Sequence, residues 1–140
     1  MQNNDNSGKI RNISVCDNFF KGSQVGFGIK ATGKEGLIED VEVKNLKMKT
    51  VSCCIYLDGT GKPASWEKGY STVRKIRISE VTAVTGAAPD KRRIAFWVEG
   101  AKELPFEDFL FENMQLQVKE YGTIANVRNL RFVNVAVEVV

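Results

Sequence analysis

The chain has 140 residues, of which 43% are hydrophobic and 26% charged, a composition typical of one globular domain with its own core. A formal net charge of +3 is too small to indicate nucleic-acid binding, and no apolar run approaches the roughly 18 residues needed to span a membrane. The chain has no histidine and no CxxC spacing, which excludes a Ser-His-Asp triad and the usual zinc sites. We therefore expect no metal and no cofactor, and we interpret Cys16, Cys53 and Cys54 as small buried apolar groups.

Residues 1–9 form a polar N-terminal segment without the apolar region of a secretory signal, so this chain gives no indication of its location. The first predicted element, IRNISVCDNFF from Ile10, begins a pattern that returns four times at intervals of 21 to 35 residues. The later copies are IEDVEVKNLKM from Ile38, VRKIRISEVTA from Val73, FEDFLFENMQL from Phe106 and VRNLRFVNVAV from Val127. We expect residues 10–140 to form a single domain built from these repeats.

A polar residue lies seven positions after the start of every repeat. These residues are Asp17, Asn45, Glu80, Asn113 and Asn134. Asn and Asp tolerate left-handed backbone conformations and bond to nearby main-chain groups, so they favour corners. We predict that the chain bends at this column, between two short strands.

Three further alternating segments lie between the repeats, at residues 25–32, 52–59 and 92–100, each ending in or near a glycine. Val, Ile, Thr and Phe dominate the apolar positions, and their period of two favours strands over helices. An antiparallel sandwich would need hairpin signals at most turns, and Asp58-Gly59 is the single one present. The pattern favours an all-β parallel β-helix with about five coils and three strands per coil. One interior column would contain Ile13, Val41, Ile76, Phe109 and Leu130.

The motif GFGIKATGKEG, followed by IEDVEVKNLKMKTV, resembles the C-terminal part of the polygalacturonase-like glycoside hydrolases, the pectin-degrading family 28 type. FEDFLFENMQL and VRNLRFVNVAV are similar to the closing coils of that family. The resemblance implies a right-handed parallel β-helix and an acidic polysaccharide or oligosaccharide as partner. In the family, a basic pair in a G-I-R-I-K motif binds a galacturonate carboxylate. Here Lys30 matches the lysine, whereas Gly28 replaces the arginine, so half of this clamp is missing.

The family's catalytic aspartates come from N-T-D and D-D motifs, followed by a G-H-G motif, and none of the three is present in this chain. The first coil begins about where the family's catalytic coils end, so we expect the chain to correspond to the last third of such an enzyme. The resemblance implies at most carbohydrate binding for the isolated chain, and it leaves open whether the chain is an enzyme. The family usually acts outside the cytoplasm.

Lys30, Asp58 and Glu99 follow equivalent strands, and we expect them to stack in one column. Asp58 and Glu99 would then approach the roughly 5 Å separation of the paired carboxylates in retaining glycosidases. One of them would act as acid and the other as nucleophile. The alternative, which we favour, is a solvated ladder of alternating charge without a catalytic role.

Sugar rings commonly stack on exposed aromatic side chains. Trp66 and Tyr70 lie with Lys62 in the longest polar insertion, so these three residues and Lys30 are the predicted substrate-binding residues. The alternative for Trp66 is a loop that folds its indole onto its own coil. A different function is also open, that of a structural module, because the end coils of a β-helix expose unpaired backbone and favour homo-oligomers through ends or edges.

Overall fold

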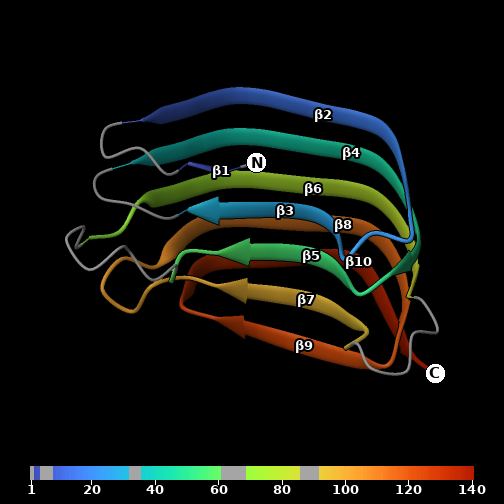
Figure 1. The fold of residues 1–140 in the computed structure, drawn as a ribbon. Coiled ribbons are helices and arrows are strands. Elements are labelled where there is room, and N and C mark those ends of the chain that lie inside the picture. The colour runs from blue at the N-terminus through green and yellow to red at the C-terminus, as the bar shows by residue number, and fades with distance from the viewer. Residues whose placement is uncertain (1, 4–7, 32–35, 61–68, 86–91) are drawn as a thin grey trace.

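The computed structural model describes residues 2–3, 8–31, 36–60, 69–85 and 92–140 (Figure 1). The regular secondary structure of these residues consists of strands alone. The strands are β1 (Gln2–Asn3), β2 (Lys9–Lys21), β3 (Val25–Ala31), β4 (Leu37–Val51), β5 (Cys53–Asp58), β6 (Thr72–Thr85), β7 (Ile94–Glu99), β8 (Phe106–Val118), β9 (Glu120–Ala125) and β10 (Val127–Val139). Within the described ranges there is thus no helix long and apolar enough to cross a membrane.

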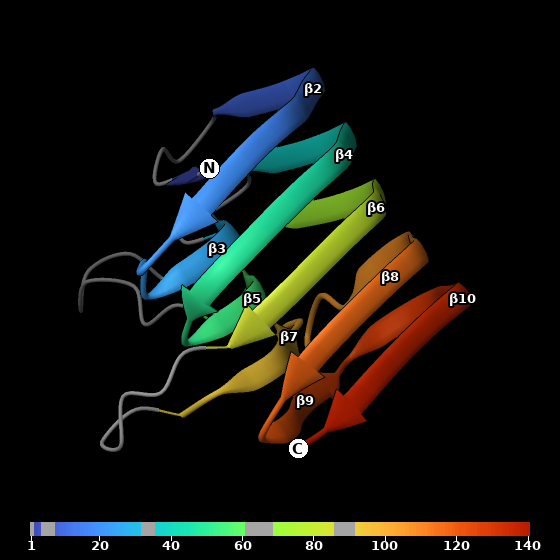
Figure 2. The same ribbon diagram turned by 90° about the vertical axis from the view of Figure 1, so that its right-hand side faces the viewer.

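Two parallel sheets face each other along the whole molecule. The short-strand sheet has the order β1-β3-β5-β7-β9, and the long-strand sheet has the order β2-β4-β6-β8-β10. Figures 1 and 2 show how the chain passes from one sheet to the other and advances by one strand each time. Residues at matching offsets pair, as Ile13 does with Val41 and Val41 with Ile76. The predicted parallel β-helix is therefore confirmed.

Every long strand bends at left-handed residues. All five residues of the predicted corner column, Asp17, Asn45, Glu80, Asn113 and Asn134, have φ angles between 52° and 58°. A second corner column lies two positions after the start of each repeat, with φ angles between 53° and 58°. It consists of Asn12, Asp40, Lys75, Asp108 and Asn129, and the sequence analysis missed it. Each coil thus has one short strand and one long strand bent twice, rather than three separate strands.

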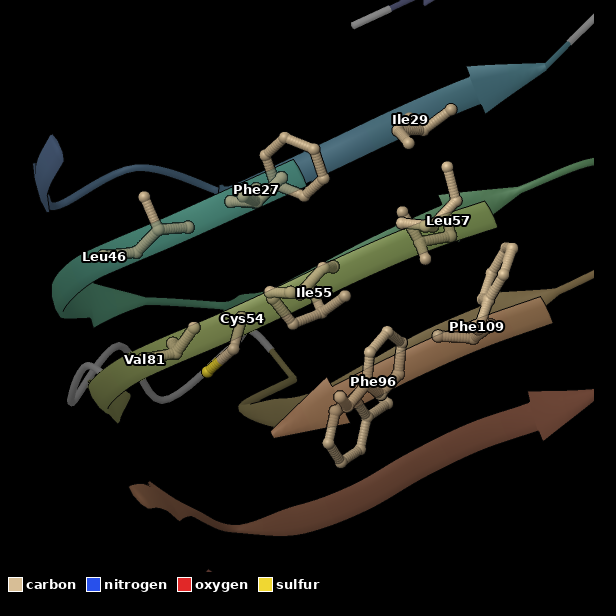
Figure 3. Packing of buried hydrophobic residues seen from close by; sticks show 14 of the residues in the cluster. Phe27, Ile29, Leu46, Cys54, Ile55, Leu57, Val81, Phe96 and Phe109 are labelled. Carbon is tan, nitrogen blue, oxygen red and sulfur yellow. The ribbon is translucent and has the colours of Figure 1, made fainter. Parts of the chain in front are cut away.

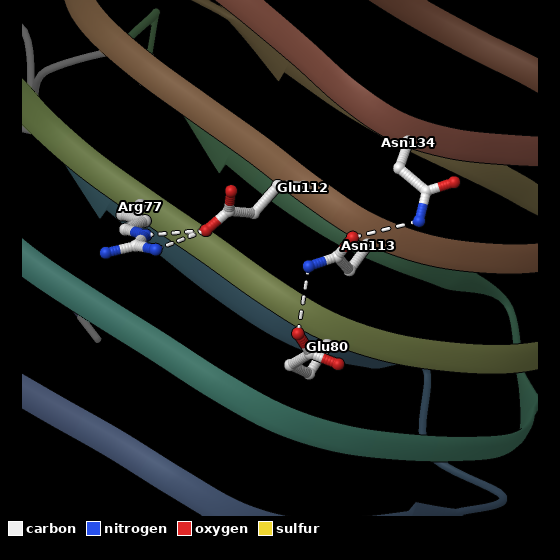
Figure 4. A network of polar contacts seen from close by, with 5 residues as sticks. All are labelled: Arg77, Glu80, Glu112, Asn113 and Asn134. Atoms are coloured by element: carbon white, nitrogen blue, oxygen red, sulfur yellow. Dashed lines mark hydrogen bonds and ion pairs between the residues drawn. The ribbon is translucent and has the colours of Figure 1, made fainter.

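Side chains at the corners bond to one another along the helix axis. Asn45 Nδ2 donates to Asp17 Oδ1 at 2.6 Å, and Asn134 Nδ2 donates to Asn113 Oδ1 at 2.9 Å. Figure 4 shows the latter bond, the bond from Asn113 to Glu80, and the neighbouring ion pair between Arg77 and Glu112. Because equivalent corners stack one above the other, each amide finds its partner on the preceding coil.

The core fills the space between the two sheets (Figure 3). In the predicted interior column, Val41, Ile76 and Phe109 are buried, whereas Ile13 and Leu130, on the outermost coils, are half-buried against them. Aromatic rings stack within the core, and the Phe96 and Phe111 rings are nearly parallel with centroids 5.7 Å apart. Burying each such side chain contributes about 1.5–3 kcal/mol to folding.

The cysteines do not all lie in the core. Cys53 and Cys54 are buried, as predicted, but Cys16 is exposed, and the prediction for it was wrong. Cys16 directly follows Val15, which packs against the core, so the alternation of the strand directs the Cys16 side chain outward.

Candidate functional site

The outer face of the short-strand sheet carries two columns of polar and aromatic side chains. On β5, Ile55 and Leu57 are fully buried while Tyr56 and Asp58 are half-exposed. The strand registers place Gly28, Tyr56, Trp97 and Thr123 in one column and Lys30, Asp58 and Glu99 in the next. The predicted stacking of the last three residues is therefore confirmed.

Local hydrogen bonds occupy the Asp58 carboxylate. Its Oδ1 accepts from the Thr60 backbone N–H at 2.8 Å and from the Thr60 hydroxyl at 2.7 Å, and its Oδ2 accepts from the Tyr56 hydroxyl at 3.2 Å. These donors occupy three of the roughly four acceptor sites of the carboxylate. The environment of Asp58 is that of a carboxylate that fixes the turn after β5.

Tyr56 and Trp97 form an aromatic pair on neighbouring strands. Their ring centroids lie 6.5 Å apart with an angle of 17° between the ring planes. The Arg92 guanidinium lies over the Trp97 ring at 5.8 Å from its centroid, and Arg92 Nη2 also donates to Glu120 Oε2 at 3.0 Å. Partial burial, together with the negative charge of Asp58 and Glu99, raises the pKa of Tyr56 to about 12, so its hydroxyl remains a hydrogen-bond donor.

The thiols of Cys53 and Cys54 on β5 are protonated at neutral pH. Burial raises the pKa of Cys53 to about 11 and that of Cys54 to about 12. The Cys53 thiol donates to the Ile55 carbonyl oxygen at 3.4 Å. Because the thiolate is the reactive form of cysteine, neither residue is an activated nucleophile.

The structure describes two of the four predicted substrate-binding residues. Lys30 is exposed on the outer face, and Tyr70 is half-buried just before β6. Lys62 and Trp66 lie outside the described residues, so their predicted roles remain predictions. The sequence analysis missed Tyr56, although its position between the apolar Ile55 and Leu57 was a signal that its side chain faces outward.

A hollow of about 440 Å³ follows the first corner column on the long-strand sheet. It is lined by Asn45, Lys47, Glu80, Val81, Thr82, Asn113, Met114, Gln115 and Asn134. Its amides already bond to the corner residues of neighbouring coils, which makes it a weaker candidate for a ligand than the aromatic face. In the part of the chain that the structure describes, no three Cys, Asp or Glu side chains are grouped to hold a metal ion.

Comparison with known proteins identifies the origin of this architecture. A comparison with curated proteins finds no match. Among protein-family models, that of the glycosyl hydrolases family 28 matches residues 2–136, which is nearly the whole chain. Together with the parallel β-helix, this match shows that the chain belongs to glycosyl hydrolases family 28.

Proposed function

We propose that this chain binds an acidic polysaccharide along the outer face of the short-strand sheet. One observation carries the proposal: Lys30, Asp58 and Glu99 stack in register beside the Tyr56–Trp97 pair, so charged and aromatic groups share one exposed face. Membership of a glycoside hydrolase family supports a polysaccharide as the ligand. By resemblance, the Lys30 ammonium would attract the carboxylate of a uronate unit.

Binding to polygalacturonate in an affinity gel tests this function. Replacing Lys30 with Gln is expected to weaken binding roughly threefold to tenfold, because one exposed ion pair contributes about 1 kcal/mol. Binding should also weaken as salt increases, since exposed charges are screened. Lys119→Gln is the matched control, because Lys119 is an exposed lysine just before β9. An equal loss of affinity for polygalacturonate in Lys30→Gln and Lys119→Gln, or no binding of the wild-type chain, would refute the proposal.

We further propose that the described residues hydrolyse no glycosidic bond. Asp58 is engaged by Thr60 and Tyr56, which supports a structural rather than a catalytic role for this carboxylate. The family's N-T-D, D-D and G-H-G motifs are absent from the chain. The alternative, a small hydrolase that uses Asp58 and Glu99, stays open to the assay described in the Discussion.

A second candidate function is self-association through the last coil. Tyr121, Ile124 and Phe132 are exposed there, and they line an apolar hollow of about 420 Å³. Exposed apolar patches of this kind favour protein contacts. The ion pairs beside the second corner column argue against head-to-tail stacking, because Arg11 and Arg128 occupy the same offset on the first and last coils and would repel each other.

The mass of the chain in solution tests this second function. A dimer that survives high salt and dissociates in Phe132→Ser is the expected result, with Phe19→Ser, an exposed phenylalanine on β2, as the control. A monomer at every protein concentration would exclude association.

A further inference from the structure

An amphipathic pocket lies next to the aromatic pair on the outer face. It has a volume of about 340 Å³, which is at the lower end of the range for small-molecule sites. Val25, Cys53 and Ile94 line it from neighbouring strands in register, and Tyr56 and Trp97 line it three residues farther along. The pocket therefore presents apolar and aromatic surface to whatever enters it.

An irregularity in the strands creates this pocket. Cys54 and Ile55 are consecutive and both fully buried, and so are Ala95 and, nearly, Phe96. Figure 3 shows Cys54, Ile55 and Phe96 within the core. With two adjacent residues facing inward on each strand, Cys53 and Tyr56 both reach the outer side, three residues apart.

The rim of the pocket is polar. Gln24, Ser52 and Arg92 complete its lining. Backbone bonds fix two of these residues, because the Cys53 N–H donates to the Gln24 carbonyl at 3.0 Å and the Ile94 N–H donates to the Ser52 carbonyl at 2.9 Å. An amide, a hydroxyl and a guanidinium thus surround an apolar interior, an arrangement that suits a ring with one apolar face and hydroxyl groups around its edge.

The charges near the pocket disfavour an anion. Arg92 is the one charged side chain among the described residues that line the pocket, and it is already paired with Glu120 and stacked on Trp97. Asp58 and Glu99 follow two residues after Tyr56 and Trp97 on the same face. A carboxylate brought into the pocket would meet no unpaired cation there and would approach two acidic side chains.

We infer that this pocket binds one uncharged pyranose unit, with the apolar face of the sugar against Tyr56 and Trp97 and its hydroxyls on the polar rim. The inference rests on the proposed function and deepens it. The pocket is lined at the strand positions of Val25 and Gly28, which precede Lys30 on β3 by five and two residues, or roughly 7–16 Å. Lys30 therefore contacts a different unit of the same polymer. The preferred ligand therefore combines an acidic unit with an uncharged one, either a neutral hexose or an esterified uronate.

Tryptophan fluorescence tests the inference directly, because the chain has two tryptophans. Trp66→Phe leaves Trp97 as the reporter and changes none of the described residues that line the pocket, and Trp97→Phe leaves Trp66. Both proteins would be titrated with three oligosaccharides of equal length: an ionised oligogalacturonide, its methyl ester and a neutral galactose oligomer. We expect Trp97 to respond to the methyl ester and the neutral oligomer at concentrations roughly tenfold lower than to the ionised one. A response confined to the neutral oligomer or to the ester identifies which uncharged unit is preferred.

Substitutions at Tyr56 and Lys30 separate the contact in the pocket from the contact with the acidic unit. Tyr56→Ala should weaken binding of the uncharged oligomers roughly tenfold and leave the ionised one within twofold, whereas Lys30→Gln should do the reverse. Tyr121→Ala, which removes an exposed aromatic ring from β9 outside the pocket, is the control.

Three outcomes overturn the inference. If the ionised oligomer binds in a Lys30-dependent manner while Trp97 remains silent with all three oligosaccharides, or if Trp97 responds to the ionised oligomer as strongly as to the uncharged ones, the pocket assignment fails and the proposed function stands. If none of the three oligosaccharides binds either reporter protein, both fail. Because Trp66→Phe leaves every described residue intact, this readout does not depend on the folding of a pocket variant.

Discussion

Asn113 donates a hydrogen bond from its Nδ2 to Glu80 Oε1, 2.9 Å away on the preceding coil, and both residues have left-handed backbone conformations. The same amide group accepts a bond from Asn134 on the following coil. This residue thus combines two roles, because it turns the chain and it links three coils.

Asn113→Ala should destabilise the protein by about 1–3 kcal/mol, because alanine pays the cost of the left-handed conformation and cannot bond to either neighbour. Asn113→Gly loses the same hydrogen bonds without the backbone strain and should cost about 1 kcal/mol less. Urea unfolding of the two variants separates these contributions. Equal destabilisation by alanine and glycine would contradict the assignment of backbone strain to this corner.

Lys75 occupies the second corner column with φ 56°. Because asparagine tolerates this conformation better than lysine, Lys75→Asn should stabilise the fold by about 0.5–1 kcal/mol. Lys47→Asn is the matched control, because Lys47 is exposed within β4 at a position without positive φ, where asparagine is disfavoured. The midpoint temperature of thermal unfolding should therefore rise in Lys75→Asn and fall in Lys47→Asn. A decrease in both variants would contradict the left-handed conformation of Lys75.

Glu39 lies between two arginines, 2.7 Å from Arg74 Nε and 3.0 Å from Arg11 Nε. The hydrogen bond from Arg74, followed by the charges of both arginines, lowers the pKa of Glu39 below its usual 4.5, against the opposing effect of burial. Because the pKa of Glu39 is lower in the folded state, its ion pairs stabilise the fold above about pH 4.5, and this stabilisation is lost as the pH falls through the folded-state pKa.

Glu39→Gln should therefore be less stable than the wild type at pH 7, and the difference should shrink as the pH falls below 4.5. Urea unfolding at several pH values measures this difference. Glu42→Gln, at an exposed position on the same strand, provides the comparison. A wild-type advantage that is constant from pH 7 to pH 3 would contradict the role of the ion pairs.

Gly28 stands where the resemblance places the missing arginine. Its hydrogen points to the outer face, where an added Cβ would lie 3.2 Å from Val25 Cγ1 and 3.5 Å from the Tyr56 carbonyl oxygen, so a side chain needs only a small shift of Val25. Gly28→Arg should raise affinity for polygalacturonate roughly tenfold by completing a basic pair with Lys30. Gly28→Gln, of similar reach but uncharged, should not, and equal gains would argue against a charge effect.

The catalytic alternative is tested by hydrolysis assays. We expect no release of reducing ends from pectic oligosaccharides by the wild type, by Asp58→Asn or by Glu99→Gln. Measurable activity that falls by a factor of roughly a thousand or more in either variant would establish the carboxylates as a catalytic pair and overturn our proposal. A small, equal change in both would indicate altered binding only.

The coil and its first corner were predictable because each depends on a periodic pattern. Alternating apolar residues defined the strands, and the recurrent polar residue at the position of Asn45 marked the bend. The second corner was missed because its column includes Lys75, a residue without turn preference, and because two corners so close together merge into one long strand.

The functional face was only half predictable. Equal offsets placed Lys30 and Asp58 in one column, and the position of Glu99 after the corresponding strand of the next coil added it to that column, which strand register confirms. The pocket depends on two adjacent inward residues, Cys54 and Ile55, which interrupt the alternation, and no sequence pattern marked that interruption. Likewise, the bonds from Thr60 to Asp58 depend on the conformation of the turn after β5.

The central claim is that ligand binds the outer face of the short-strand sheet. Backbone amide chemical shifts, measured by NMR while a partly esterified oligogalacturonide is added, test it most directly. The account predicts perturbations clustered on β3, β5 and β7, at Lys30, Tyr56, Trp97 and their neighbours. Perturbations confined to the corner column around Asn113, or to the last coil around Phe132, would contradict it.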